Sequence, residues 1–446
     1  QCGTTLTLGG SGDTVALGSG ASQSGFKAVD WVTDSIKTAT FTAVSGKGYF
    51  CNTNGGAFNI TLPSSPSAGD TVALKDYNGK FSTNNLTIDR NGSKLDANEL
   101  NKALDTDNLS MTLVYVDATQ GWKSVEEGTG YIGENFIVAT GGTITTSGNC
   151  KIHKFTGPGT FTVCSVACSA ANNLVSYMVV AGGAGGGWDR GGGGGAGGFR
   201  ETKSPSTPYT ASPLDGYATP GNRITVTAQG YPIVVGGGGT ASSGPPAPTA
   251  RGGTGGVSTF STITSAGGGG GGAANPSAPT GPGVDGGSGG GAANRSPSTL
   301  SGGSGNTPPT TPAQGSNGGP SVHPGVSPGG GGGGATAVGA TATNGVGNGV
   351  PGGAGATTHI SGASVAYAGG GGGGASYCCG STCRTGGPGG TGGGGQGGNS
   401  PGGDAGCAGT VNTGGGGGGG GNPSPSGPST GGAGGSGIVI IRYKYQ

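Results

Sequence analysis

The stretch that decides the fold is Gly182–Gly437, which opens as GGAGGG at residues 182–187 and repeats runs of glycine to its end. It contains two Leu and four Ile, too few for an ordinary apolar core of that length. Something other than side-chain burial must therefore hold it together. The uninterrupted runs are Gly191–Gly195, Gly236–Gly239, Gly267–Gly272, Gly329–Gly334, Gly369–Gly374, Gly392–Gly395 and Gly414–Gly421.

Two interpretations fit such a composition. The first is disorder, because glycine loses the most conformational entropy on ordering. Disordered segments are usually rich in charged residues, however, whereas this long segment carries only about a dozen. The second is a sandwich of polyglycine II helices, which form no internal hydrogen bonds and can therefore bond to one another. At about 3.1 Å per residue, six to eight glycines span roughly 19 to 25 Å. We expect the runs to be rods, with the segments rich in Ser, Thr and Pro as loops at their ends.

Strong strands bracket the glycine region. Val175–Ala181 runs directly into the first glycines, and Ile438–Tyr445 follows the last. We expect these two strands to pair in one small sheet, so that the glycine region is an insertion whose ends are held together. Residues 134–181 plus 437–446 then form a small β domain around a polyglycine II domain of residues 182–436. Other strands predicted in this β domain are Phe136–Ala139, Lys151–Phe155 and Thr160–Cys164.

The first part of the chain has the pattern of ordinary β structure, so the predicted fold class is mainly β. Residues 1–30 predict a thin β segment that needs partner chains. Residues 31–133 predict a β-sandwich or jelly-roll-like domain, because short strands recur between turns. Leu95–Leu104 gives the one hint of helix. The predicted strands are Lys37–Val44, Lys47–Cys51, Ala57–Leu62, Asp70–Asp76, Asn85–Asp89, Met111–Val116 and Gly121–Val125.

Charge and hydropathy exclude several classes of partner. Only 9% of the residues are charged and the net charge is +1, which gives no electrostatic case for nucleic acid or an anionic membrane. No segment approaches the ~20 apolar residues of a membrane span, so no membrane insertion is expected. The chain begins at Gln1 without Met or an apolar leader, which favours a fragment or a processed product.

The nine cysteines are an odd number, so at least one thiol would be free or intermolecular in a secreted protein. Zinc binding by the last four is an alternative to disulfides, but these residues lack the C-x2-C spacing of most zinc sites. We expect no metal and no cofactor. The predicted clamps are Cys164 with Cys168, and Cys378 or Cys379 with Cys383 or Cys407.

Nothing in the sequence points to catalysis. His153, His323 and His359 lie far apart, and none is coupled to a Cys or to a Gly-x-Ser-x-Gly turn. The many GxGxxG matches follow from the glycine content alone. We therefore expect a protein that is not an enzyme, since a hydrolase site would have to be assembled between chains.

Aromatic residues are the stronger signal for binding. Trp188, Phe199 and Phe260 lie beside glycine runs and are expected to cap the glycine layer. Rigid amphipathic rings stack on sugars, and binding residues favour loops. The tyrosines predicted to contact a receptor are Tyr209, Tyr217, Tyr367 and Tyr377.

Several motifs resemble proteins of bacteriophage tail fibres. The chain resembles a β-module of marine phage fibres, especially those of cyanophages, at four stretches: Ser45–Phe50, Leu62–Asp70, Asn91–Lys94 and Val116–Trp122. The glycine-rich domain of phage fibres resembles Phe155–Val163, Tyr177–Gly183 and Gly435–Tyr443. The glycine runs are also similar to tail-fibre adhesins in which polyglycine helices form a sandwich and loops bind the host receptor.

The resemblance implies a non-enzymatic, homotrimeric tail fibre on the virion surface. Its partners would be a host glycan or outer-membrane protein and other virion tail proteins. The loops here are rich in Pro, Ser and Thr instead of aromatic residues, which departs from the adhesin pattern. Three alternatives stay open: a structural virion or extracellular filament protein with glycosylated loops, an ice-binding protein, and a depolymerase. An ice-binding face would favour a strict Gly-x-x repeat, which these runs lack.

Overall fold

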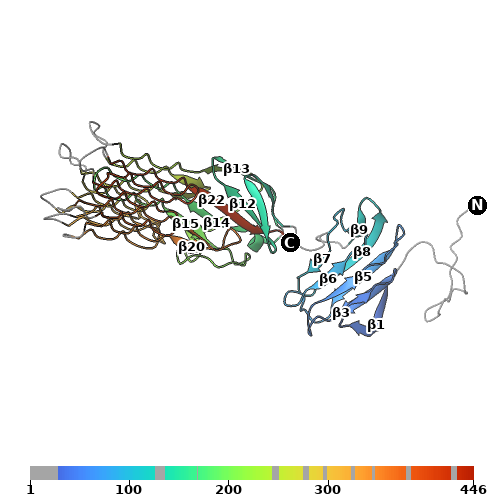
Figure 1. The fold of residues 1–446 in the computed structure, drawn as a ribbon. Helices are drawn as coiled ribbons and strands as arrows, with labels where there is room; N and C mark the ends of the chain where they lie inside the picture. The colour runs from blue at the N-terminus through green and yellow to red at the C-terminus, as the bar shows by residue number, and fades with distance from the viewer. Residues whose placement is uncertain are drawn as a thin grey trace, which may run out of the picture. The chain divides into compact units, whose positions relative to one another are not determined.

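A computed structural model describes residues 29–125, 136–167, 169–243, 251–274, 281–294, 299–322, 327–343, 347–377, 383–422 and 429–446. The chain divides into two compact units, Gln1–Glu134 and Asn135–Gln446. Strands dominate the regular structure of both units, which confirms the prediction of a mainly β fold (Figure 1). The predicted thin β segment at residues 1–30 lies almost wholly outside the described residues.

Two sheets face each other in the first unit, in the orders β1-β3-β5-β8-β9 and β2-β4-β6-β7. Apolar residues from both sheets, such as Tyr49, Ile60 and Leu74, share one buried core. This arrangement agrees with the β-sandwich class. The strands are β1 (Asp30–Lys37), β2 (Phe41–Thr42), β3 (Lys47–Cys51), β4 (Phe58–Thr61), β5 (Thr71–Asp76), β6 (Leu86–Asp89), β7 (Lys102–Leu104), β8 (Ser110–Asp117) and β9 (Gly121–Ser124).

The strand order of this unit differs from that of a jelly roll. Strands β1 to β6 alternate between the two sheets, and neighbouring strands run parallel in the pairs β1–β3, β3–β5, β2–β4 and β4–β6. Successive strand pairs therefore form the coils of a short solenoid, which antiparallel β7, β8 and β9 complete. A jelly roll is antiparallel throughout, so that part of the expectation is wrong.

The stretch Leu95–Leu104 forms a turn followed by β7, which corrects the hint of helix. Asp96 and Ala97 have φ values of 47° and 66°. This left-handed backbone is incompatible with a right-handed helix. The two N–H groups donate instead to the carbonyls of Trp122 and Gln120, at 3.0 and 2.8 Å. Tertiary hydrogen bonds thus override the local helical preference.

Two further sheets, here called the framework, form the base of the second unit. Their orders are β10-β13-β17-β18-β19 and β11-β12-β22-β14-β15, and Phe161, Phe260 and Tyr443 lie in the core that they share. The strands of this unit are β10 (Val138–Thr140), β11 (Thr143–Ser147), β12 (Cys150–Phe155), β13 (Gly159–Ser165), β14 (Leu174–Val180), β15 (Phe199–Thr202), β16 (Ile224–Thr225), β17 (Gly230–Val234), β18 (Ser258–Phe260), β19 (Ile263–Ser265), β20 (Ala356–Thr358), β21 (Val365–Tyr367) and β22 (Ile438–Lys444). Two short 3-10 helices are η1 (Ala170–Asn173) and η2 (Pro220–Asn222).

The strands that bracket the glycine region pair as predicted. β14 and β22 are antiparallel, with Val180 opposite Ile438. Tyr177 and Val179 pack into the core between the framework sheets, whereas Met178 and Val180 pack into a second core on the other face of β14. Burial on both faces explains why β14 is an almost continuous apolar run. The pairing also holds the two ends of the insertion together.

Between β14 and β22, glycine-rich segments run out from the framework and back many times (Figure 1). Segment 191–198 lies at the centre of this bundle. The N–H groups of Gly192, Gly193 and Gly194 donate to three different segments at 2.8–3.0 Å, and the next three residues repeat the order. Carbonyls of the same segment accept hydrogen bonds from three others. The six partner segments are 181–187, 266–274, 288–294, 329–334, 369–375 and 414–422.

These seven segments, called the inner segments, need glycine because their backbones approach one another closely. A Cβ on Gly193 would lie 2.0 Å from the carbonyl oxygen of Gly371, and one on Gly187 would lie 1.7 Å from that of Gly272. Both distances are far shorter than any van der Waals contact. By contrast, a Cβ on Gly237, near the bundle's edge, would meet nothing within 4 Å. Hydrogen bonds and close backbone packing thus replace the missing apolar side chains.

Candidate binding surface at the far end of the bundle

The far end of the bundle, opposite the framework, is where the outgoing segments stop. Two chain reversals there belong to the described residues, at 188–190 and at 401–403. The remaining outgoing segments reach this end at Ser243, Ala274, Asn294, Val322, Thr343, Tyr377 and Asn422.

The reversal at residues 188–190 ties three segments together. The Trp188 carbonyl accepts a hydrogen bond from the Ala274 N–H, and the Arg190 carbonyl accepts one from the Asn294 N–H, both at 3.2 Å. Asp189 and Arg190 form an ion pair at 3.0 Å. Their φ values of 45° and 46° fix the tight turn. The partly exposed Trp188 side chain is thereby held on a rigid base.

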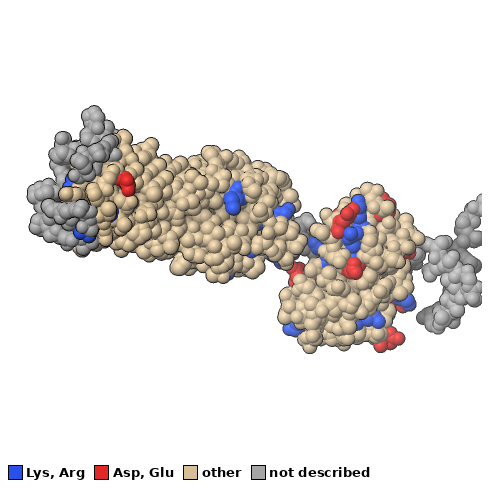
Figure 2. Space-filling view, viewed as in Figure 1, with Lys and Arg blue, Asp and Glu red and all other residues tan. Residues whose placement is uncertain are grey.

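A second group of polar and aromatic residues lies on neighbouring segments at the same end. The Asn399 amide donates to the Asp404 carboxylate at 2.9 Å. Tyr377 is 36% exposed and follows Ser376, whose N–H donates to the Gly347 carbonyl at 2.8 Å. These groups offer hydrogen bonding and ring stacking to a ligand. Charged residues are sparse on the visible face of the second unit (Figure 2).

Tyr209 and Tyr367, two of the predicted contact residues, lie instead at the framework end. Tyr367 is 4% exposed in the second core, and Tyr209 packs against that core. Burial, followed by the nearby Glu201 carboxylate, raises the pKa of Tyr209. Burial also raises the pKa of Glu201, whose carboxylate accepts hydrogen bonds from the Ser212 N–H and the Thr358 hydroxyl. These tyrosines therefore belong to a buried polar cluster and offer little surface to a receptor.

Tyr217 is also at the framework end, in the loop before η2. It is half-buried, and the Arg223 guanidinium lies 4.4 Å from its ring centroid. The Arg223 Nε also donates to the Tyr217 carbonyl at 2.9 Å. Only Tyr377, of the four predicted tyrosines, lies at the far end. A tyrosine next to a glycine run can lie at the framework end or at the far end of the bundle, so the sequence alone could not show which tyrosines are at the far end.

The residues predicted to cap the glycine layer occupy three different places. Phe199 is 1% exposed in the second core, where Ala335 and Ala368 of the bundle also pack. Phe260 belongs to the framework core, and Trp188 lies at the far end. Only Phe199 is therefore in a core shared by strands and glycine segments.

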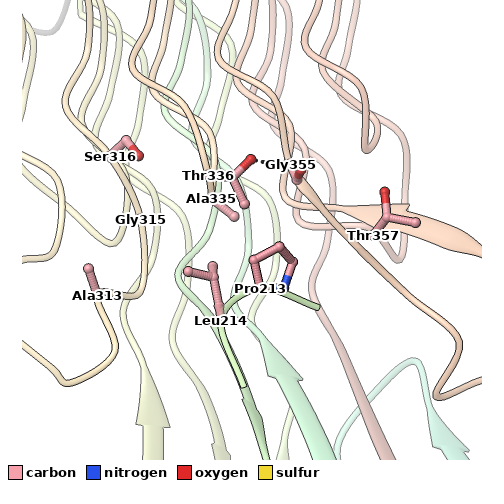
Figure 3. Close-up of a pocket in the computed structure, with 9 residues that line it drawn as sticks. All are labelled: Pro213, Leu214, Ala313, Gly315, Ser316, Ala335, Thr336, Gly355 and Thr357. Atoms are coloured by element: carbon pink, nitrogen blue, oxygen red, sulfur yellow. Dashed lines mark hydrogen bonds between the residues drawn. The ribbon is translucent and has the colours of Figure 1, made fainter. Parts of the chain in front are cut away.

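A groove that the sequence did not predict lies on the side of the bundle near the framework (Figure 3). It has a volume of about 480 Å³. Pro213, Leu214 and Ala335 give it an apolar floor, and the Thr336 hydroxyl at its rim donates to the carbonyls of Ala354 and Gly355. Its polar side chains are hydroxyls that form no acid–base pair. The other lining residues are Ala313, Gly315, Ser316, Gly355 and Thr357.

The predicted cysteine clamps fall mostly outside the described residues. Cys168, Cys378 and Cys379 lie there, so the pairings that involve them stay predictions. Cys164, Cys383 and Cys407 are exposed, and none of them is bonded to another described cysteine. The alternative zinc site is likewise incomplete among the described residues, which contain no cluster of three or more metal-ligating side chains.

His153 has a structural environment in the framework. The His153 ring is buried and its Nδ1 lies 2.7 Å from the Gly141 carbonyl oxygen. Because a carbonyl only accepts, Nδ1 carries the proton, and Nε2 accepts from the Tyr443 hydroxyl at 3.0 Å. His323 lies outside the described residues, and His359 belongs to the turn after β20.

We expect the stability of the second unit to fall at acidic pH because of His153. Burial lowers the pKa of His153 below its ordinary value of 6.5, so the unfolded chain binds the proton more tightly. This stabilising contribution is fully present above pH 6.5 and is lost as the pH falls through the lower folded-state pKa. Denaturant unfolding between about pH 8 and about pH 5 measures the change. The variant His153→Gln should show a smaller pH dependence; an equal dependence would exclude His153 as the cause.

The second unit thus defines a class of protein in which a β framework carries a hydrogen-bonded bundle of glycine segments. Residues 155–444 match the glycine-rich domain family, and because this match covers more than half of the chain, the chain belongs to that family. No curated protein matches the chain. Within the described residues, we find no helix with the length and apolar character of a membrane span.

Proposed function

We propose that this chain is a non-enzymatic, receptor-binding adhesin of the bacteriophage tail-fibre type. The observation that carries the proposal is the direction of the glycine segments, which begin and end on the framework and reverse at the far end. A rigid bundle with few side chains would present the far end as the contact surface, since binding residues favour connections held on a rigid scaffold. The resemblance to phage-fibre motifs supports the same function.

We further propose that the inner segments are polyglycine II helices. In each of them, N–H groups three residues apart donate to the same neighbouring segment, and segment 191–198 is bonded to six others. None of its glycines has a positive φ. A threefold extended helix without internal hydrogen bonds accounts for both properties, because its donors and acceptors point outward in three directions.

The chemistry of the far end favours a host glycan as the receptor, with an outer-membrane protein as the second candidate. Its described side chains include amides, hydroxyls and aromatic rings, together with the Asp189–Arg190 ion pair and the charged Arg251, Arg384 and Asp404, a set that suits a polar, hydrogen-bonding ligand. A homotrimer, other tail proteins as partners and a location on the virion surface complete the proposal. The homotrimer rests on the phage resemblance and on the thin β segment predicted at residues 1–30; the other two points rest on the resemblance alone.

Tyr377→Ala should reduce binding of the protein to host cells by about tenfold, the size of the loss expected when one ring contact is removed from a small interface. The measurement is adsorption of fluorescently labelled protein to a panel of marine bacterial strains that includes cyanobacteria. Tyr217→Ala is the matched control, because this tyrosine is half-buried at the framework end. Binding that is lost equally in both variants, or in neither, would contradict a contact surface at the far end. No adsorption to any strain would favour the structural alternative.

A further inference from the structure

Several outer segments of the bundle have a side chain facing solvent at every third residue; segment 236–239 is an exception, because Gly237 and Gly238 are exposed. In segment 383–391, Thr385, Pro388 and Thr391 are exposed, whereas Gly386 and Gly387 between them are buried. The same period occurs elsewhere along the edge of the bundle. Exposed residues three apart are Thr254 and Val257, Ser301 and Ser304, Val338 and Thr341, Asn348 and Pro351, and Cys407 and Thr410.

Proline occupies some of these outward positions. The carbonyls of Pro351 and Pro388 accept hydrogen bonds from Ala340 and Gly352, at 3.1 and 3.0 Å. Proline has no N–H, so neither residue presents a donor to the outside. The inner segments, which supply N–H groups to the interior, contain no proline. At these two positions proline therefore stands where a donor would face solvent.

The edge of the bundle still has unpaired backbone groups. Gly389 is partly exposed, and neither its N–H nor its carbonyl is bonded to any other described residue. In the interior, such groups bind the next glycine segment, and that contact requires the absence of a Cβ. An outward side chain at every third residue keeps another backbone from approaching to this distance. Edge strands of β-sheets are protected from pairing in a comparable way by proline and charged residues.

We infer that the flanks of the bundle at segments 383–391 and 251–257 are docking surfaces for a glycine segment of a second copy of this chain, held closed by their own outward side chains and, in segment 383–391, by proline. The occupant follows from the bundle itself, in which segments of the same sequence already pack in this manner. At these flanks the bundle therefore ends at its outer segments instead of growing by addition of further chains. This inference is independent of what the far end binds.

The test opens one flank. The full-length variant Thr385→Gly/Pro388→Gly/Thr391→Gly should associate through segment 383–391, with an increase in mass of about twofold or more over the parent. Light scattering coupled to size-exclusion chromatography measures the mass. The matched control is Thr385→Ala/Pro388→Ala/Thr391→Ala, which restores the donor of residue 388 but keeps a Cβ at each position. The control should have the mass of the parent.

A second variant, Thr254→Gly/Val257→Gly, opens another flank and keeps the test decisive when the first variant does not fold. The inference is overturned if a folded glycine variant retains the parent mass, or if the alanine control associates equally. Loss of folding in both glycine variants would also overturn it, because the outward side chains would then be needed for stability and not for closing the flank. Amide hydrogen exchange of the inner segments reports whether each variant is folded.

Discussion

Gly193→Ala should lower the free energy of unfolding of the second unit by about 3 kcal/mol, the upper end of the usual cost of overpacking. Gly193 lies in the central segment, and its Cβ would meet the Gly371 carbonyl at 2.0 Å. Relief of that clash requires one segment to move, which breaks hydrogen bonds on both of its sides. Chemical denaturation of the full-length protein measures the loss.

Gly237→Ala is the matched control for this substitution. It changes the same residue type in the same bundle, but its Cβ would meet nothing within 4 Å. Its stability should stay the same or rise by roughly 0.4–1 kcal/mol, because alanine restricts the unfolded chain. Equal destabilisation by the two substitutions would mean that the intrinsic backbone preferences of glycine, and not close packing, explain why the inner segments need glycine.

Arg442→Ala should also destabilise the second unit by about 3 kcal/mol, since a hydrogen bond to a charged group contributes roughly 1.5–3 kcal/mol. Arg442 is 3% exposed in β22. Its guanidinium donates to the carbonyls of Pro208, His359, Ile360 and Ser147 at 3.1–3.5 Å, and it lies 5.2 Å from the Tyr209 ring centroid. One side chain of β22 thus binds β11 and two loops.

Arg442→Lys should have an intermediate effect, because an ammonium group keeps the charge but lacks the planar fork of donors. Arg223→Ala is the control, since the exposed Arg223 side chain contacts Tyr217 alone among the described residues, through one hydrogen bond and the ring. Thermal unfolding ranks the three variants. An Arg442→Ala protein as stable as the Arg223→Ala protein would show that the four carbonyls are satisfied without the guanidinium.

The strand pairing around the glycine region could be predicted because its signal is local. Val175–Ala181 and Ile438–Tyr445 are dense apolar runs, and both join glycine directly, so few other arrangements close the insertion. The positions of most other strands were predictable for the same reason, since alternation and turn residues are local properties.

The relative direction of the strands and the burial of individual tyrosines could not be predicted in the same way. Alternation gives the same pattern for parallel and antiparallel strands, so the solenoid of β1 to β6 could not be separated from a jelly roll. Likewise, Tyr367 and Tyr377 each lie beside the run Gly369–Gly374, one before it and one after it. Only the direction of that segment, from the framework outward, places the first in a core and the second at the far end.

The proposal of an ordered glycine bundle is tested most directly by amide hydrogen exchange on the full-length protein. An ordered bundle predicts slow exchange for segments 191–198, 329–334 and 369–375, whose N–H groups are hydrogen-bonded and buried. It predicts faster exchange for exposed Thr254 and Thr391 at the bundle's edge. Uniformly fast exchange across residues 182–437 would contradict the bundle, and the search for a binding surface would then turn to the β units.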